Sequence, residues 1–242
     1  MIHLSETDST SNYLNALSAK QPLEEFTVVT ADYQISGKGQ RGNSWESARG
    51  ENLLFSFILY PSFLEVRYQF ILSQIVSLAV KETLDTYDKD FSIKWPNDIY
   101  WKDKKICGIL LENDLLGSSF QKSIAGVGIN VNQKTFISDA PNPVSLWQIT
   151  GEEHSISLVL TNVMVKVNCY YNLLKEGKTD LIINHYHDSL YRKEGFYTYQ
   201  DNAGKFKARM VEVEPTGTLI LEDTTGKKRN YLFKEVQYVL PE

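Results

Sequence analysis

The chain has 242 residues, a formal charge of −5 and 42% hydrophobic residues, enough for one medium-sized domain with a real core, or one domain with a small appendage. This acidic balance argues against a general nucleic-acid surface, which needs a basic face. No apolar run reaches the roughly 18 residues of a membrane span, and the N-terminus lacks the basic and apolar regions of a signal peptide. The sequence therefore predicts a cytoplasmic protein with no membrane partner.

The two cysteines, Cys107 and Cys169, lie in apolar surroundings and belong to no metal-binding or redox motif. We expect both to be reduced residues of the core. The four histidines have no ligand spacing with either cysteine, which argues against a zinc site. No protein-held metal is predicted.

Short polar side chains precede the first helical pattern. Ser9, Thr10 and Ser11 stand directly before an apolar pattern of helical spacing that starts at Tyr13. Such residues are typical of a helix N-cap. Hydroxyls at a helix start, where N–H groups point outward, can also hold a ligand. The two interpretations are compatible.

A glycine-rich polar segment, residues 36–47, separates two predicted strands, residues 26–33 and 53–60, and Gln34 lies where the first strand meets it. A loop of this length in a compact domain is either functional or disordered. Glycine lets backbone N–H groups approach an anion, and Arg41 can grip a phosphate or carboxylate with two donors. Composition alone leaves open whether this loop binds an anion or is a solvated, flexible loop.

The middle of the chain predicts a buried helix followed by a hairpin. Residues 66–87 are apolar on most faces, as in a helix packed under a sheet. The hairpin lysines are typical of a solvated turn, but Lys105 opens an apolar strand three residues before Gly108 and could lie over a cleft floored by bare backbone. The predicted hairpin comprises strand 91–95, a polar turn at Asn97 and Asp98, strand 99–101, a turn at residues 102–105 and strand 106–112.

The strand predicted at residues 123–132 has two different faces. One face is apolar, and the other carries Gly126, Gly128, Asn130 and Asn132. Glycine weakens a strand, so two of them need a reason. One reason is a flat ligand against the backbone with the amides at its rim, and the other is close packing of a helix on the sheet. The paired asparagines favour a ligand.

Helices are predicted at residues 155–174 and 180–190, and the character of the chain changes after residue 190. Short strands separated by glycine-containing turns follow, a pattern that predicts a small barrel. We therefore expect a larger domain at residues 1–190, to which the resemblance described next assigns catalysis, and a C-terminal domain at residues 191–242. The predicted C-terminal strands are residues 196–200, 205–213, 219–222, 229–233 and 236–239.

These motifs together resemble the biotin protein ligases. The resemblance covers essentially the whole chain and implies an α+β fold: a mixed β-sheet with packed helices, similar to class II synthetases, followed by an SH3-like barrel. Residues 94–98, Lys-Trp-Pro-Asn-Asp, match the most specific signature of that family. The glycine-rich stretch 37–45 resembles its biotin loop, and residues 104–112, 126–132 and 145–146 complete the order.

The resemblance implies an ATP-dependent, AMP-forming ligase. Biotin would be activated to biotinyl-5′-AMP with release of pyrophosphate, and then transferred to a lysine of a biotin carboxyl carrier protein, such as an acetyl-CoA carboxylase subunit. Mg²⁺ would bridge the triphosphate oxygens. Two alternatives stay open: a transferase similar to the lipoate and octanoate enzymes, whose signature differs, and a non-catalytic nucleotide-binding adaptor, against which Lys105 and Asn130 argue.

The resemblance also implies site residues. Lys105 and Arg41 would be catalytic, with Lys105 in contact with both the biotin carboxylate and the α-phosphate. The expected biotin-binding residues are Ser9, Thr10, Ser11, Gln34, Lys38, Gly39, Gln40, Lys105 and Gly108. The expected adenylate-binding residues are Arg41, Trp45, Asn97, Asp98, Asn130 and Asn132.

The sequence departs from the family pattern at three places. An extra residue in the usual Ser-Thr-Asn leaves the role of Ser11 open. Lys38 and Gln40 replace frequent arginines, and a neutral Gln40 would hold the adenylate less firmly. The Ser-Thr motif begins at Ser9, which leaves no room before it for the DNA-binding domain of longer members, so we expect a ligase without a DNA partner. Relatives form dimers, but no residue here decides whether this chain does.

Overall fold

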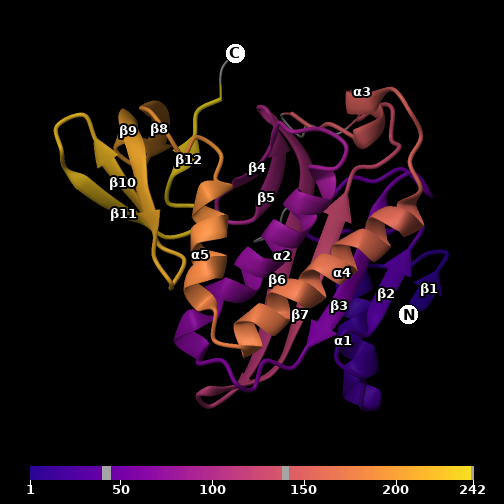
Figure 1. Cartoon of the computed structure of the whole chain (residues 1–242). Coiled ribbons are helices and arrows are strands. Elements are labelled where there is room, and N and C mark those ends of the chain that lie inside the picture. The colour runs from indigo at the N-terminus through magenta and orange to yellow at the C-terminus, as the bar shows by residue number, and fades with distance from the viewer. Residues whose placement is uncertain (40–44, 138–141, 241–242) are drawn as a thin grey trace.

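The computed structural model describes residues 1–39, 45–137 and 142–240 (Figure 1). Its centre is a seven-stranded sheet with the order β1-β2-β3-β7-β6-β5-β4. β1 and β2 are parallel, and the remaining neighbours are antiparallel. The mixed sheet confirms the predicted α+β class. Its strands are β1 (Ile2–Leu4), β2 (Val28–Ala31), β3 (Leu53–Leu59), β4 (Phe91–Lys94), β5 (Asp98–Trp101), β6 (Lys104–Leu116) and β7 (Ser119–Ile129).

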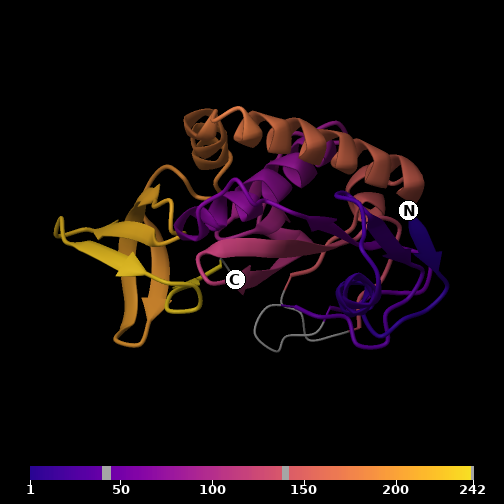
Figure 2. The same cartoon turned by 90° about the horizontal axis from the view of Figure 1, so that it is seen from below.

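Helices cover one face of this sheet and part of the other. α2 (Phe70–Leu84), α4 (Ile156–Lys175) and α5 (Thr179–Asp188) lie on one side, and α1 (Thr10–Lys20) lies on the opposite side (Figure 2). α1 packs Leu14 against Val29, Ile58 and Ile124, one side chain from each of three neighbouring strands. The burial of both faces explains why every residue of β3 is buried.

The helix predicted at residues 66–87 is divided in the structure. A short 3-10 helix, η2 (Val66–Tyr68), precedes α2, which is buried almost throughout. α3 (Leu146–Thr150) is a short helix whose Ser145 forms a capping box with Gln148. Among the described helices, none is long and apolar enough to cross a membrane.

Other local predictions from the sequence were also wrong, among them the end of the strand predicted at residues 123–132, which stops at Ile129. The strand expected at residues 26–33 contains only Val28–Ala31, because Phe26 has a φ of 64° outside the strand region. The second hairpin turn is made by Lys102 and Asp103, so Lys105 lies within β6. Cys107 is buried, but Cys169 is exposed, because it lies on the outward side of the amphipathic α4.

The C-terminal strands form a second, separate antiparallel sheet with the order β11-β10-β9-β8-β12. The expected run of short strands is therefore correct. Within the described residues the two edge strands do not pair with each other, so this unit is an open five-stranded sheet and a closed barrel is not found. The boundary at residues 190 and 191 stays a prediction. The strands are β8 (Tyr197–Asp201), β9 (Gly204–Val213), β10 (Leu219–Asp223), β11 (Lys228–Tyr231) and β12 (Gln237–Tyr238).

The segment that joins β4 to β5 contacts both the C-terminal unit and α5. Trp95 Nε1 donates a hydrogen bond of 3.0 Å to the carbonyl of Gly217, and Tyr186 Oη donates one of 2.6 Å to the carbonyl of Pro96. Gly217 has a φ of 93°, and a β-carbon there would lie 2.9 Å from the Phe70 ring. The C-terminal unit and α5 therefore together hold this segment in place.

Replacing Trp95 by phenylalanine is expected to lower the free energy of unfolding by about 1 kcal/mol, because the bond to Gly217 is lost and its carbonyl loses a donor. Proteolysis between α5 and β8 should become faster. Trp101→Phe is the matched control, since its Nε1 bonds Asp88, away from the C-terminal sheet. Equal proteolysis of the two variants would contradict this role of Trp95.

Candidate active site

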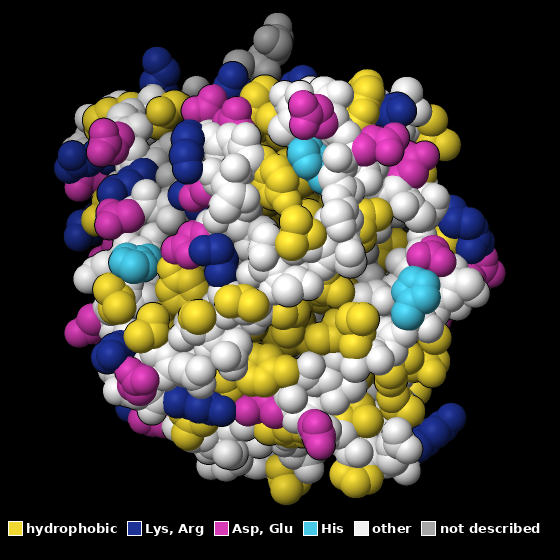
Figure 3. Space-filling view, turned by 45° about the vertical axis from the view of Figure 1, so that its right-hand side comes forward, with side chains coloured by type: hydrophobic (Ala, Val, Ile, Leu, Met, Phe, Trp, Pro, Cys, Tyr) yellow, Lys and Arg dark blue, Asp and Glu magenta, His cyan; other side chains and the backbone are white. Residues whose placement is uncertain are grey.

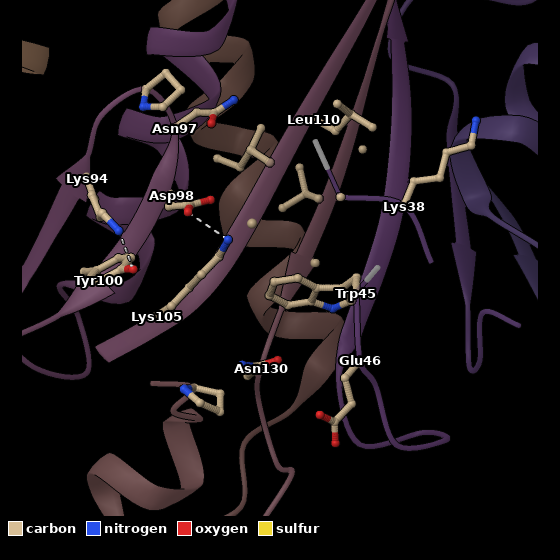
Figure 4. A pocket seen from close by; sticks show the side chains of 18 of the residues that line it. Lys38, Trp45, Glu46, Lys94, Asn97, Asp98, Tyr100, Lys105, Leu110 and Asn130 are labelled. Atoms are coloured by element: carbon tan, nitrogen blue, oxygen red, sulfur yellow. Dashed lines mark hydrogen bonds and ion pairs between the residues drawn. The ribbon is translucent and has the colours of Figure 1, made fainter. Parts of the chain in front are cut away.

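A cavity of about 1350 Å³ runs along β6 and β7 and reaches the C-terminal sheet. Residues far apart in the sequence meet in it (Figure 4). Asn132 does not line it, and Gln40 and Arg41 lie outside the described residues. The predicted site residues that line the cavity are Ser9, Thr10, Ser11, Gln34, Lys38, Gly39, Trp45, Asn97, Asp98, Lys105, Gly108 and Asn130.

One end of the cavity is a cluster of buried hydroxyl groups. The Oγ atom of Ser56 lies 2.7 Å from Thr10 Oγ1 and 2.9 Å from Ser11 Oγ. Gln34 Oε1 accepts hydrogen bonds from both the backbone and the side chain of Thr10. Ser9 occupies the N-cap position of α1 but makes no side-chain capping bond. Gln34 therefore caps the helix in its place, and the hydroxyls remain grouped in the cavity.

Ser56 was not among the site residues expected from the sequence. The signal was present, because Ser56 is the one polar residue of the otherwise apolar β3, and a buried hydroxyl needs partners. Gly126 lies beneath the cluster, where a β-carbon would be 2.5 Å from Ser11 Oγ. The hydroxyl cluster therefore explains both residues: Ser56 supplies a hydrogen-bond partner, and Gly126 leaves the space that Ser11 Oγ occupies.

An ion pair occupies the middle of the cavity. Lys105 Nζ lies 2.8 Å from Asp98 Oδ2, and both side chains are about 30% exposed. The backbone of Lys105 is fixed on one side by β5 and on the other by residues 142–144, since its N–H donates to the carbonyl of Asn142 and its carbonyl accepts from Val144 N–H. The ammonium group is thus aimed into the cavity from a rigid strand.

The glycines of β6 and β7 form a floor, and the indole of Trp45 lies on it. A β-carbon at Gly108 would be 2.9 Å from the Trp45 ring, and one at Gly128 would be 2.6 Å from Trp45 Nε1. The flat ligand predicted against this bare backbone stays a prediction, and in this structure the ring of Trp45 lies there instead. Trp45 Nε1 is buried and has no hydrogen-bond partner in the described part of the chain.

The two asparagines that follow β7 have different surroundings. Asn130 is 2% exposed and donates to the carbonyl of Val144, and its Oδ1 has no partner among the described residues. Asn132 exchanges two hydrogen bonds with the backbone of His154, both of 2.9 Å. Asn130 can therefore offer an acceptor to a ligand, whereas the amide of Asn132 is engaged in holding the loop before α4.

Lys38 and Lys94 approach the cavity from opposite sides. Lys38 Nζ donates to Asn12 Oδ1 at 2.5 Å and lies 3.9 Å from Glu112. Lys94 Nζ donates to Tyr100 Oη at 2.8 Å. Burial lowers the pKa of Lys94 to about 8, although the Asp98 carboxylate opposes this shift. Lys94 was not among the expected contact residues, and neither was Tyr238 of the C-terminal sheet, which lines the same cavity.

A metal ion in this cavity would need ligands from a bound nucleotide in addition to the described side chains. Across residues 1–39, 45–137 and 142–240, no group of three or more His, Cys, Asp or Glu side chains could hold a metal ion. Mg²⁺ usually binds through substrate phosphates with one or two carboxylates and keeps several waters. The donor set of this cavity therefore suits an ion that arrives with a phosphate ligand.

A model of the biotin/lipoate A/B protein ligase family matches residues 4–130, more than half of the chain. The chain belongs to this family. The bifunctional ligase/repressor BirA of Bacillus subtilis is 29% identical over 235 residues, which are 94% of this chain and 70% of that protein. The human biotin–protein ligase is 37% identical over 132 residues, which are 52% of this chain and 18% of that protein.

The fold of this family member is also that of solved biotin protein ligases. The ligase from Aquifex aeolicus, in complex with biotin and ATP, matches 98% of each chain with a TM-score of 0.80 and 27% identity. The ligase from Leishmania major, in complex with biotinyl-5-AMP, matches 96% of this chain with a TM-score of 0.67 and 20% identity. This second match supports the fold alone.

Proposed function

We propose that this chain is a biotin protein ligase: it joins biotin to AMP and then transfers biotin to a lysine of a carrier protein. The observation that carries the proposal is the Lys105–Asp98 ion pair, which shares one cavity with a cluster of buried hydroxyls and a floor of glycines. The similarity along 98% of both chains to a ligase with biotin and ATP supports the same function.

The first half-reaction joins two anions. A carboxylate oxygen of biotin attacks the α-phosphorus of ATP, the bond from this phosphorus to the bridging oxygen breaks, and pyrophosphate leaves with the electron pair. The products are biotinyl-5′-AMP and pyrophosphate. Cations must neutralise the approaching carboxylate and the charge that builds on the phosphoryl oxygens. Lys105 would serve both, because its ammonium projects from β6 into the centre of the cavity.

The second half-reaction makes an amide. An uncharged lysine amine of the carrier attacks the carbonyl carbon of the mixed anhydride, AMP leaves, and the nitrogen gives up one proton. The carboxylate of Asp98, held by Lys105, is a proton acceptor near the cavity centre.

Within this proposal the cavity is divided between two ligands. The hydroxyl cluster, Gln34 and Lys38 would bind biotin, with Gly39 and Gly108 beside it. Asn97, Asp98, Asn130 and Trp45 would bind the adenylate, as predicted from the family motifs. Gln40, Arg41 and Asn132 also belong to the predicted set, but only Asn132 lies in the described chain, and its amide bonds would have to change before it could contact a ligand.

The remaining parts of the proposal concern partners and location. Mg²⁺ would accompany the triphosphate of ATP and neutralise its charge. The carrier would be a biotin carboxyl carrier protein or domain, and the chain would act in the cytoplasm. On the face in Figure 3, basic and acidic side chains are interspersed rather than gathered by sign, in keeping with the expected absence of a DNA partner, which stays a prediction along with the possible homodimer.

Exchange of labelled pyrophosphate into ATP tests the proposal. The reverse of adenylation requires the correct acid, so exchange is expected with biotin and not with lipoate. The parallel reaction with lipoate is needed because the family includes lipoate ligases. Exchange with lipoate alone would favour the transferase alternative, and no exchange with either acid would favour the non-catalytic adaptor.

A further inference from the structure

The side chain of Gln133 does not line the active-site cavity, but it joins two segments that do. Gln133 follows β7 and is 2% exposed. Its Oε1 accepts hydrogen bonds from the backbone N–H of Ala48, at 3.0 Å, and from Asn52 Nδ2. Its Nε2 donates to Glu46 Oε1 at 3.3 Å and to the carbonyl of Thr135 at 2.9 Å. A glutamine amide has two acceptor and two donor positions, so all four are used.

The two joined segments both reach the cavity. Trp45 and Glu46, which Figure 4 shows on one segment, line it together with Phe136 of the other. Neither residues 45–52 nor residues 131–137 form a helix or a strand, so a regular ladder of backbone hydrogen bonds does not fix their relative position. That position therefore depends on individual hydrogen bonds such as those of the buried glutamine amide.

Asn52 and Glu46 extend this network to the central sheet and to the end of the second segment. Asn52 is 3% exposed, and its Oδ1 accepts from the N–H of Val131 at 3.0 Å. Glu46 Oε1 also accepts from the N–H of Ile137 at 2.9 Å. Asn52 directly precedes β3, Val131 follows β7, and these two strands pair with each other. The network is therefore anchored to the sheet, and a buried network of bonded polar groups rigidifies its surroundings.

We propose that Gln133 is a positioning residue for the reaction: by fixing the segment that follows Trp45, it holds the indole on the glycine floor. This deepens the proposed ligase function and rests on it. The backbone N–H of Trp45 donates to the carbonyl of Gly37 at 2.9 Å, which fixes the chain before the ring. Gln133 fixes the chain after the ring, through Glu46 and Ala48. The indole N–H has no partner within the described residues, so these anchors and the contact with bare backbone determine where the ring lies.

The expected consequence is larger for ATP than for biotin. Trp45 belongs to the predicted adenylate contacts, and a ring whose position is not fixed must be ordered when the nucleotide binds, which weakens binding. The hydroxyl cluster at the predicted biotin end of the cavity is held by Gln34 instead, through its two hydrogen bonds with Thr10. Loss of the Gln133 amide should therefore leave that end of the cavity intact.

Pyrophosphate exchange by Gln133→Leu tests this difference. Leucine is close to glutamine in size but makes none of the four hydrogen bonds. The KM for ATP is expected to rise about 5- to 30-fold, as for the loss of one or two hydrogen bonds, whereas biotin affinity measured by calorimetry should stay within about twofold of wild type. Thr83→Val is the control, because it removes a buried hydrogen bond of α2, to the carbonyl of Ala79, away from the cavity. It should lower the free energy of unfolding and leave the KM for ATP unchanged.

Two comparisons with Trp45→Ala show whether Gln133 acts through the ring. In the Trp45→Ala background, Gln133→Leu should change the KM for ATP by less than about twofold, because the ring that Gln133 positions is gone. The fluorescence of Trp45, taken as the difference between each protein and its Trp45→Ala counterpart, gives a readout that does not depend on activity. Acrylamide should quench this emission more strongly in Gln133→Leu than in the wild type, where the indole N–H is buried.

Several results would overturn the inference. These are an unchanged KM for ATP in Gln133→Leu, an equal rise with and without Trp45, and an equal loss of biotin affinity. If Gln133→Leu does not fold, Gln133→Glu takes its place, since it keeps the shape but puts a carboxylate where Nε2 donates to Glu46; unchanged quenching of Trp45 in that variant would also reject the role of Gln133. Absence of wild-type exchange with biotin would reject the proposed ligase itself, while the quenching comparison would still decide whether Gln133 positions the ring.

Discussion

Replacing Lys105 by methionine is expected to slow the formation of biotinyl-5′-AMP by about 10²- to 10³-fold, with the fold retained. Methionine keeps most of the length and the apolar stem of lysine but removes its charge. The charge on the phosphoryl oxygens grows as the carboxylate attacks, so the ammonium stabilises the transition state more than the ground state. Lys105→Met should also weaken biotin binding, because the carboxylate loses its cation and Asp98 is left unpaired.

Single-turnover rates of the two half-reactions isolate this effect. Transfer from pre-formed biotinyl-5′-AMP should be slowed less than adenylation, because the attack on phosphorus is already complete. Lys104→Met is the matched control, since Lys104 is the exposed neighbour of Lys105 on β6, and its rates should match wild type. Adenylation by Lys105→Met at a near wild-type rate would remove Lys105 from the mechanism.

The second large effect is expected from Gly128→Ala. The added β-carbon would lie 2.6 Å from Trp45 Nε1 and 2.7 Å from Trp45 Cε2, distances at which the ring must move. Overpacking of this kind typically costs about 1–3 kcal/mol. With the indole pushed from the glycine floor into the cavity, the KM for ATP should rise by about 5- to 150-fold, the factor that corresponds to this energy.

A double-mutant cycle tests whether the contact with Trp45 is the cause. Trp45→Ala removes the ring that the new methyl group would meet, so adding Gly128→Ala to it should change the KM for ATP by less than about twofold. Equal effects of Gly128→Ala with and without Trp45 would show that the glycine matters for another reason. An unchanged KM for ATP in the single variant Gly128→Ala would contradict the claim that the Trp45 ring needs bare backbone at position 128.

The sequence predicted most of the cavity because its chemistry is concentrated in short motifs. Lys105 and Gly108 come from one strand and Gly126 and Gly128 from the next, and pairing of β6 with β7 places Gly108 opposite Gly128. Strand alternation was sufficient to predict a bare face. Strand alternation did not predict the position of Asn132, because β7 ends at Ile129 and the residues after it no longer alternate between the two faces of the sheet.

The parts that the sequence could not predict depend on contacts between distant segments. Tyr100 lies close to Lys94 in the chain, but Tyr238 comes from β12, and only the docking of the second sheet brings it to Lys94. In the same way, Gln34 rather than Ser9 caps α1 because the segment that follows β2 places it beside Thr10. Neither periodicity nor a motif encodes such a contact.

The most direct test of the central claim is mass spectrometry of a carrier domain incubated with this protein, ATP and biotin. One lysine of the carrier is expected to gain one biotinyl group, ATP should be consumed to AMP and pyrophosphate, and lipoate should not be attached when it replaces biotin. A carrier that stays unmodified with biotin, or that is modified with lipoate instead, would contradict the assignment of this chain as a biotin protein ligase.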